Sequence, residues 1–236
     1  AVFGLHINSG LDIGKLEYKS GPFMASVDWF YVTVKGKGAH GAAPWNGVDP
    51  IMVSAQIING IQTIVSRSED LTEAPVVITV GKINGGVREN IIPEEVKFSG
   101  TIRTLNETIH QDVYQKIQRT AENIAKGFGA EATVRFKSVT KVTYNDPALT
   151  IKSLPSLYKA AGKEKVEERR WSTGGEDFAF YGDKAPALFF NLGGRPVGAD
   201  ASKEGGHHTP NFYVDDSRLD VGVKAFCHLV FDYTKK

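Results

Sequence analysis

Six predicted secondary-structure elements follow one another between residues 29 and 136 in an order that few folds accommodate. The strands are runs of β-branched and aromatic residues, and the helices carry apolar residues at three-to-four spacing. The order β-α-β-β-α-β is the split βαβ, or ferredoxin-like, motif. The expected elements are a strand at 29–34, a helix from Asp49, strands at 75–80 and 95–102, a helix at 107–128 and a strand at 132–136.

The helix that begins near Asp49 has the clearest local signals. Asp49 suits the N-cap and Pro50 suits the first helical position, where a missing N–H costs nothing. Asn84-Gly85-Gly86 predicts a turn between the second and third strands. The apolar stripe of the helix needs a sheet to cover, and it comprises Ile51, Ala55, Ile58, Ile61 and Val65.

The segments on either side of this motif alternate strand and helix signals, which is typical of an α/β layer. The signals are a strand at 2–5, a turn at Asn8-Ser9-Gly10, a helix before Gly162, strands near Val166 and at 187–191, and a helix from about Ser217. Each flank is too poor in strands to make a sheet alone. We therefore predict an α/β fold in which residues 1–27 and 138–236 form one discontinuous domain and residues 28–137 form an inserted ferredoxin-like domain.

The charge balance gives no support to several classes of partner. Lys and Arg number 28 against 27 for Asp and Glu, so the net charge of +1 favours neither nucleic acid nor an anionic membrane surface. No apolar stretch reaches the roughly eighteen residues of a membrane span, and the compartment, cytoplasmic or exported, stays open. The single cysteine, Cys227, lies in an apolar run that predicts a buried helix position.

A loop of small residues after the first strand of the motif carries one imidazole. The run Gly36-Lys37-Gly38-Ala39-His40-Gly41 leaves His40 without bulky neighbours, and its glycines let the backbone lie close to a ligand. These features make His40 a candidate catalytic residue. A surface turn with an uninvolved histidine explains the same residues.

Two further histidines stand where ligands often bind. His6 follows the apolar strand at 2–5, at the strand end where open α/β sheets place their ligands. His208 belongs to the run 205–210, in which His207 and His208 face opposite ways, so that only one of them points inward. Neutral imidazoles at the two sites could ligate zinc. The alternative for His6 is an ordinary strand-end imidazole, and two histidines so distant in sequence do not by themselves establish a metal site.

Two more groups of residues suit the binding of a carboxylate. The segment with Gly174, Gly175 and Glu176 predicts a helix start that holds an anion or positions an acid, although acidic residues there also favour the helix dipole without any ligand. Arg103, on the third strand of the motif, can grip a carboxylate bidentately, and with Asn90 beside it forms a candidate clamp. A strand arginine on a solvated face is the alternative.

Seven short motifs occur along the chain in a single order. They are Ala1-Val2-Phe3-Gly4-Leu5-His6, Gly21-Pro22-Phe23-Met24-Ala25-Ser26, Gly36-Lys37-Gly38-Ala39-His40, Asn90-Ile91-Ile92-Pro93, Gly100-Thr101-Ile102-Arg103-Thr104, Gly174-Gly175-Glu176-Asp177-Phe178 and His208-Thr209-Pro210. Together they resemble the aminoacylase, carboxypeptidase and hippurate hydrolase family of two-zinc amidohydrolases, over the whole chain. The β-α-β-β-α-β unit is similar to that family's lid, or dimerisation, domain.

The resemblance implies a metal centre and a reaction. His6 and His208 would ligate different zinc ions of a two-zinc site, for which manganese and cobalt are alternative metals. The implied reaction is hydrolysis of an amide bond in small N-acyl amino acids or peptides. Zinc would polarise the carbonyl and lower the pKa of the attacking water, and a glutamate would shuttle the proton.

The resemblance also assigns roles to the remaining candidates. His40 would reach the partner subunit's site in a homodimer formed through the lid domain and stabilise the tetrahedral oxyanion. Asn90 and Arg103 would hold the substrate's carboxylate, with the backbone of Gly174 and Gly175 near it. Glu176 would line the pocket in a role that the resemblance does not specify.

The sequence departs from the family pattern in one respect. The family's N-terminal half domain, with its Cys-Gly-His-Asp ligand motif and its Glu-Glu pair, has no counterpart here, which leaves about one protein ligand per metal where three or more are normal. We therefore expect a hydrolase as the parent protein and a metal-free, inactive fragment in this chain alone. The alternative function is a non-enzymatic dimerisation or binding module. Nucleic-acid binding by the ferredoxin-like sheet is disfavoured, because its strands lack an aromatic and basic signature.

Overall fold

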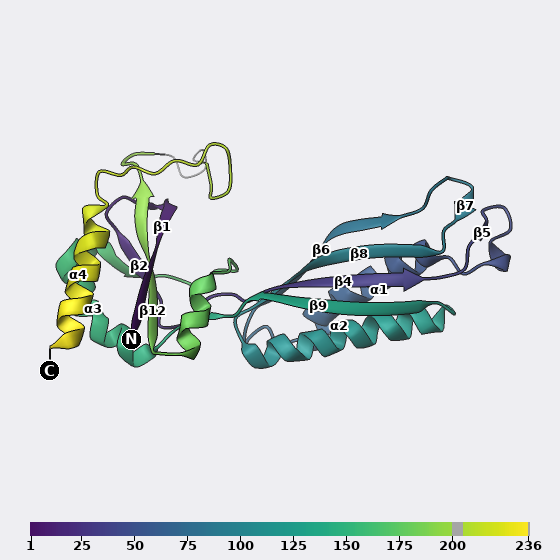
Figure 1. Cartoon of the computed structure of the whole chain (residues 1–236), viewed down its shortest axis with the longest axis horizontal. Helices are drawn as coiled ribbons and strands as arrows, with labels where there is room; N and C mark the ends of the chain where they lie inside the picture. The colour runs from purple at the N-terminus through teal and green to yellow at the C-terminus, as the bar shows by residue number, and fades with distance from the viewer. Residues whose placement is uncertain (200–204, 236) are drawn as a thin grey trace. The chain divides into compact units, whose positions relative to one another are not determined.

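The computed structural model describes residues 1–199 and 205–235 (Figure 1). The chain forms two compact units. Unit 1 comprises Ala1–Met24, Thr143–Ser172 and Glu176–Lys236, and unit 2 comprises Ala25–Val142 and Thr173–Gly175. The predicted inserted domain, 28–137, lies inside unit 2.

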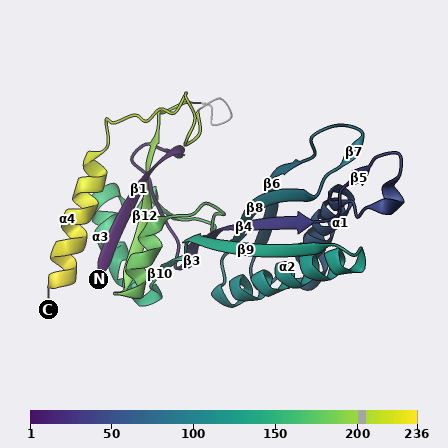
Figure 2. The same ribbon diagram turned by 45° about the vertical axis from the view of Figure 1, so that its right-hand side comes forward.

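Unit 2 is a four-stranded antiparallel sheet with two helices on one face (Figures 1 and 2). The strand order is β6-β8-β4-β9, so the first and third strands of the unit lie at the centre of the sheet. This topology confirms the expected ferredoxin-like unit. Its main elements are β4 (Val27–Lys35), α1 (Pro50–Thr63), β6 (Val76–Gly85), β8 (Glu95–Thr104), α2 (Glu107–Gly127) and β9 (Glu131–Thr140).

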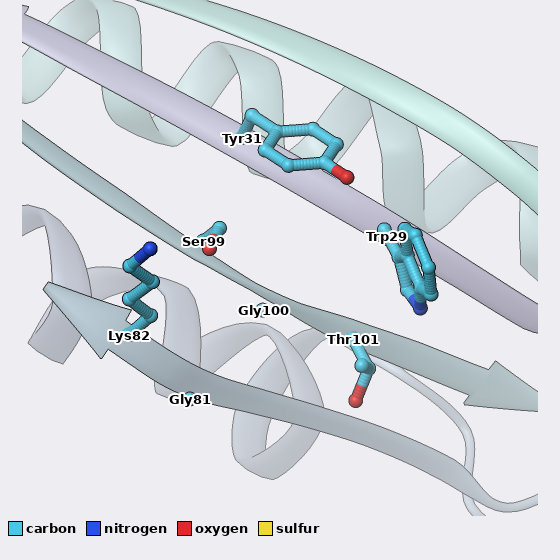
Figure 3. Close-up of a pocket in the computed structure, with 7 residues that line it drawn as sticks. All are labelled: Trp29, Tyr31, Gly81, Lys82, Ser99, Gly100 and Thr101. Carbon is cyan, nitrogen blue, oxygen red and sulfur yellow. The ribbon is translucent and has the colours of Figure 1, made fainter.

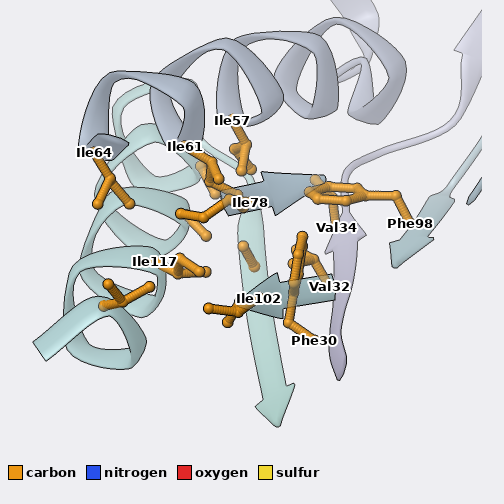
Figure 4. Close-up of a cluster of buried hydrophobic side chains, with 14 of the residues drawn as sticks. Phe30, Val32, Val34, Ile57, Ile61, Ile64, Ile78, Phe98, Ile102 and Ile117 are labelled. Atoms are coloured by element: carbon orange, nitrogen blue, oxygen red, sulfur yellow. The ribbon is translucent and has the colours of Figure 1, made fainter. Parts of the chain in front are cut away.

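Alternation along the central strand decides which face of this sheet is buried. Phe30, Val32 and Val34 of β4 are buried beneath the helices, whereas Trp29 and Tyr31 point to the opposite face. Figure 4 shows these side chains packed against isoleucines from both helices and from the neighbouring strands. We use "open face" for the sheet surface opposite α1 and α2.

The first helix begins where the sequence predicts. Asp49 is the N-cap and its carboxylate accepts a hydrogen bond from the Ile51 N–H at 2.8 Å, with Pro50 in the first turn.

The turn predicted at Asn84-Gly85-Gly86 is wrong, because β6 continues through Asn84 and Gly85 and pairs there with β8. The smaller elements of unit 2 are β5 (Ala39–His40), the 3-10 helix η1 (Pro44–Asn46), the π-helical turn η2 (Ile64–Ser68) and β7 (Ile91–Ile92).

Unit 1 contains a four-stranded mixed sheet in the order β1-β12-β2-β11, on which α3 and α4 pack through one cluster of buried residues. β1 and β12 run parallel, as do β2 and β11, whereas β12 and β2 are antiparallel. The elements are β1 (Val2–Asp12), β2 (Leu16–Tyr18), β3 (Gly21–Met24), β10 (Thr143–Asn145), α3 (Pro147–Ala161), the 3-10 helix η3 (Lys163–Lys165), β11 (Val166–Glu168), the 3-10 helix η4 (Asp177–Asp183), β12 (Ala187–Arg195) and α4 (Asp220–Thr234).

The first strand is longer than its sequence indicates. The predicted turn at Asn8-Ser9-Gly10 lies inside β1, where Asn8 pairs with Gly193 of β12. The two backbones come so close that a Cβ at Gly193 would stand 1.9 Å from the carbonyl oxygen of Asp12. A local turn contact is nevertheless kept inside the strand, because Asn8 Oδ1 accepts a hydrogen bond from the Gly10 N–H at 2.8 Å where the pairing of β1 with β12 shifts.

Cys227 lies on α4 as predicted, but it is exposed rather than buried. The buried face of α4 is formed by Val221, Gly222, Ala225 and Leu229, and Cys227 is displaced from Ala225 by about half a turn. An apolar run on a surface helix therefore does not place all of its members in the core.

Within residues 1–199 and 205–235, no helix is long and apolar enough to cross a membrane.

Candidate functional site

His6 lies within β1, opposite Asn191 of β12, and not at the strand end that the sequence predicts. Its side chain is exposed. Nδ1 lies 2.5 Å from the carbonyl oxygen of Ile7, and because a carbonyl only accepts, Nδ1 is the nitrogen that carries the proton. In the neutral ring Nε2 then carries the lone pair, through which an imidazole binds a metal ion or accepts a proton.

The histidine whose ring contacts His6 is His207, which sequence reasoning did not select. The two rings meet edge to face with centroids 5.2 Å apart, and Nε2 of His207 lies 3.4 Å from the backbone N–H of Ser9. Burial lowers the pKa of His207, as do the charges of His6 and His208, so the ring is neutral at pH 7. No sequence signal told the two adjacent histidines apart.

His208 is exposed and stands in the left-handed region at φ 63°. Among the residues that the structure describes, it is the single non-glycine residue with a positive φ. A side chain with a Cβ is strained there by about 1–2 kcal/mol. Such strain often accumulates at functional sites, which keeps His208 a candidate.

Glu176 is the N-cap of η4. Its carboxylate accepts a hydrogen bond from the Phe178 N–H at 3.4 Å. The expected helix start is therefore present, although the helix is 3-10 in type. Burial raises the pKa of Glu176, the neighbouring carboxylate of Asp177 raises it further, and the charge of His6 opposes the shift. The carboxyl group thus sits close enough to His6 for their charges to interact.

The donor set of this region does not by itself make a metal centre. Across the described residues, no group of three or more His, Cys, Asp and Glu side chains is arranged to hold a metal ion. His6 offers one free imidazole nitrogen, and a catalytic zinc site normally takes three protein ligands. These residues alone therefore do not support a chemical step on a metal ion.

His40 and Asn90 are brought together at one end of unit 2. β5 pairs with β7, setting His40 opposite Ile91, and the Gly41 N–H donates to the Asn90 carbonyl oxygen at 2.8 Å. His40 is exposed, and its Nδ1 accepts a hydrogen bond from the Ala42 N–H at 3.0 Å. The neutral ring therefore carries its proton on Nε2, which makes that outward nitrogen a hydrogen-bond donor.

Arg103 lies at the other end of the same sheet, half-buried and paired with Val77 of β6. β8 is 10 residues long, so its two ends lie about 30 Å apart. Asn90 belongs near the Glu95 end and Arg103 near the Thr104 end. The expected clamp of Asn90 beside Arg103 is therefore not formed within one copy of the chain, because antiparallel pairing sends the two residues to opposite ends.

Gly174 and Gly175 are both exposed, and packing accounts for the second of them. A Cβ at Gly175 would stand 2.0 Å from Val27 and 2.8 Å from Thr140. The residue must therefore be glycine whether or not its backbone touches a ligand.

A buried polar network next to Arg103 was missed at the sequence level. Asp28 is fully buried on β4, with Oδ2 at 2.8 Å from Nε2 of His110, and the Tyr114 hydroxyl donates to its Oδ1 at 2.6 Å. Nδ1 of His110 lies 3.0 Å from Glu107. The signal was available, because Asp28 occupies the same inward register as Phe30 and a charge there needs a partner.

Comparison with known proteins gives a consistent picture. Residues 26–128 match the peptidase dimerisation domain family. The chain is 38% identical over 221 residues to the N-acetyl-L-cysteine deacetylase of Bacillus subtilis, covering 93% of this chain and 50% of the deacetylase. It is 35% identical over 242 residues to thermostable carboxypeptidase 2 of Saccharolobus solfataricus, covering 100% of this chain and 58% of that enzyme.

A solved structure agrees with these sequence matches. A dinuclear metal-binding M20 peptidase of Bacillus subtilis aligns with a TM-score of 0.76 at 30% identity, covering 99% of this chain and 57% of that one. The chain thus spans between half and three-fifths of the length of these relatives. Residues 26–128 thus contain the M20 peptidase dimerisation domain, and nearly the whole chain is similar to part of an M20 peptidase, a deacetylase and a carboxypeptidase.

Proposed function

We propose that the protein takes part in metal-dependent hydrolysis of an amide bond next to an amino acid carboxylate, in N-acyl amino acids or peptides, with zinc as the metal. The observation that carries this proposal is the 38% identity to a deacetylase across 93% of the chain. The free Nε2 lone pair of His6, together with the raised pKa of Glu176 nearby, supports it. A carboxyl group with a raised pKa is better suited to exchange protons near neutral pH.

The residues of unit 1 would serve the reacting end of the substrate. His6 contributes a metal ligand through Nε2, while His207 holds its ring from the side at 5.2 Å between centroids. His208 remains the proposed second ligand, and its strained backbone supports a functional constraint. Glu176 is proposed to hold and release a proton at its carboxylate.

The residues of unit 2 would serve the carboxylate and the oxyanion. Arg103 offers a bidentate guanidinium to a carboxylate, with the Gly174 and Gly175 backbone proposed near it. His40 offers its Nε2–H to a developing oxyanion, with Asn90 beside it. Because Arg103 and His40 occupy opposite ends of one sheet, we propose that His40 and Asn90 act on a partner subunit's substrate in a homodimer formed through unit 2.

Zinc titration tests the metal part of the proposal. Any zinc affinity that the wild-type chain shows at this site should fall at least tenfold in the His6→Ala variant, since one ligand nitrogen is lost. His228→Ala, on α4, is the matched control and should bind zinc like the wild type. Equal zinc affinity in all three proteins would remove His6 from the metal site.

Ligand binding and turnover test the chemical part. A panel of N-acetyl amino acids, with N-acetyl-L-cysteine among them, should shift the NMR signals of the wild-type chain, and Arg103→Lys should weaken this binding because a bidentate contact is lost. Absence of binding by the whole panel would contradict the proposal. The expectation that the chain alone is inactive remains a prediction, which any zinc-dependent turnover by the 236-residue chain would refute.

The alternative function, a non-enzymatic dimerisation module, is supported by the dimerisation domain match at 26–128. It predicts a stable dimer without metal and without affinity for N-acyl amino acids. Sedimentation of the metal-free chain, compared with the ligand titrations, separates the two functions.

A further inference from the structure

The open face of the unit 2 sheet carries a hollow that the proposed hydrolysis does not use. Its volume is about 270 Å³. Figure 3 shows Trp29 and Lys82 at its two ends, with Tyr31 and Ser99 between them and Thr101 beside Trp29. An apolar ring, an ammonium group and several hydroxyls around one concave surface are the elements of a small-molecule site. The lining residues are Trp29, Tyr31, Gly81, Lys82, Ser99, Gly100 and Thr101.

A second hollow continues the first along the sheet. It has a volume of about 250 Å³ and shares Tyr31, Lys82 and Ser99 with its neighbour. Its lining adds Lys97 and Arg135, so this end of the groove is basic whereas the Trp29 end is aromatic. We call the two hollows together the open-face groove. Its size approaches that of sites that hold one drug-sized ligand.

Strand register explains why these side chains meet. Tyr31 stands opposite Ser99 on one side and Arg135 on the other, and Ser99 stands opposite Lys82. The pairing of β6 with β8 shifts between Val80 and Lys82, which is a bulge at Gly81. A bulge changes which side chains face each side of the sheet, and here it turns Lys82 onto the open face.

The charges at the basic end are only partly compensated. Lys97 forms an ion pair with Glu95 at 2.6 Å. Within the described part of the chain, no ion pair with an acidic side chain is formed by Lys82 or Arg135, and the Arg135 guanidinium lies over the Tyr31 ring at 5.5 Å. The groove therefore presents two unpaired cations to a ligand, with hydroxyl donors between them, which is complementary to an anion with several oxygens.

The aromatic end offers a flat surface. Trp29 is 39% exposed, and the Lys137 ammonium lies 5.0 Å from the centre of its ring. An exposed indole is a stacking surface for a planar ring, worth about 1–3 kcal/mol for a nucleobase by alanine substitution. The aromatic residues of this face come from β4 and the basic residues from β6, β8 and β9, so the combination appears only when the four strands are assembled.

We propose that the open-face groove binds a nucleoside phosphate, with the base against Trp29 and the phosphates between Lys82 and Arg135. This site lies outside the hydrolytic residues of the proposed function. A single small ligand suits the groove better than a nucleic-acid strand, because aromatic side chains come from β4 alone and acidic Glu95 and Glu131 stand beyond the basic end.

Calorimetric titration of the full chain with ADP tests the proposal. We expect saturable binding, with adenosine and inorganic pyrophosphate each binding at least about tenfold more weakly, since each lacks one of the two groups recognised. Lys82→Ala and Arg135→Ala should each weaken ADP binding by about tenfold, because a charge-assisted hydrogen bond is lost. Trp29→Ala should weaken ADP and adenosine alike.

Matched controls keep the result specific. Trp45→Ala removes another exposed tryptophan of unit 2, and Lys126→Ala removes a lysine from α2 on the other side of the sheet, so both should bind ADP like the wild type. No saturable ADP binding, or binding that Lys82→Ala and Arg135→Ala leave unchanged, would overturn the proposal. So would tighter binding of single-stranded RNA that grows with its length, or a dimer that Trp29→Ala dissociates.

Discussion

His110 of unit 2 and the histidines near His6 in unit 1 have opposite surroundings. In unit 2, His110 is buried between Asp28 and Glu107 and makes contacts with both carboxylates. In unit 1, His6 is exposed, His207 is half-buried against it, and His208 is exposed in a strained conformation. The difference teaches that the surroundings of an imidazole, rather than its presence in a motif, separate a structural role from a candidate for chemistry.

The largest expected effect comes from breaking the buried network of unit 2. In Asp28→Ala, the ring of His110 and the hydroxyl of Tyr114 lose their shared buried partner, so the free energy of unfolding should fall by about 3–5 kcal/mol. Urea unfolding measures the change. Glu107→Ala is the control, because this side chain is 59% exposed, and it should cost less than about 1 kcal/mol. If Asp28→Ala changes the free energy of unfolding only slightly, water replaces the missing carboxylate as the partner of His110 and Tyr114.

The second prediction concerns pH, to which the two units should respond in opposite directions. Burial disfavours the charged form of His110, but the neighbouring carboxylates of Asp28 and Glu107 outweigh this effect and raise the pKa of the ring. The resulting stabilisation is complete below about pH 6.5 and is lost as pH rises through the raised pKa. The pKa of His207 is lowered instead, mainly by burial, so its contribution is present above about pH 6.5 and is lost on acidification.

Hydrogen exchange resolved by unit can measure this contrast. Between pH 6 and 8, protection of unit 2 should fall by at most about 1.4 kcal/mol per pH unit relative to His110→Asn. Protection of unit 1 should fall between pH 7 and 5, relative to His207→Asn. Identical pH profiles in a variant and the wild type would show that the histidine concerned does not titrate as its surroundings indicate.

The third prediction tests the strain at His208. Glycine adopts a φ of 63° freely and alanine does not, so His208→Gly should be more stable than His208→Ala by about 1 kcal/mol. Thermal unfolding of the two variants, both of which lack the imidazole, isolates the backbone effect. Equal stability would mean that the loop relaxes once the ring is removed, and the contrast with the well-accommodated His110 would weaken.

What the sequence could predict depended on the range of the interactions. The start of α1 follows from Asp49 and Pro50, which act on their own first turn, and the order of elements in unit 2 follows from local periodicity. The position of His6 within β1 depends on pairing with β12, almost the whole chain away, which local signals do not contain. The separation of Asn90 from Arg103 likewise follows from strand pairing rather than from the residues near either.

Side-chain partners were harder still to anticipate. The sequence did not show which of His207 and His208 contacts His6, because two adjacent histidines look alike to local signals. The contact of His207 with His6 depends on the three-dimensional path of the chain. Asp28 was recognisable in principle, because alternation along β4 places it among buried residues, but its partner His110 comes from α2. The ferredoxin-like fold was therefore predictable in outline, and the buried contact between Asp28 and His110 was not.

The smallest expected effect concerns Cys227, where the prediction of burial failed. Because its side chain is exposed on α4, Cys227→Ser should change the free energy of unfolding of unit 1 by less than about 0.5 kcal/mol. Leu229→Ala, two residues further on the buried face, should cost at least about 2 kcal/mol. A thiol reagent should label Cys227 in the native chain nearly as fast as in urea. Slow labelling would show that something covers this face of α4 in solution.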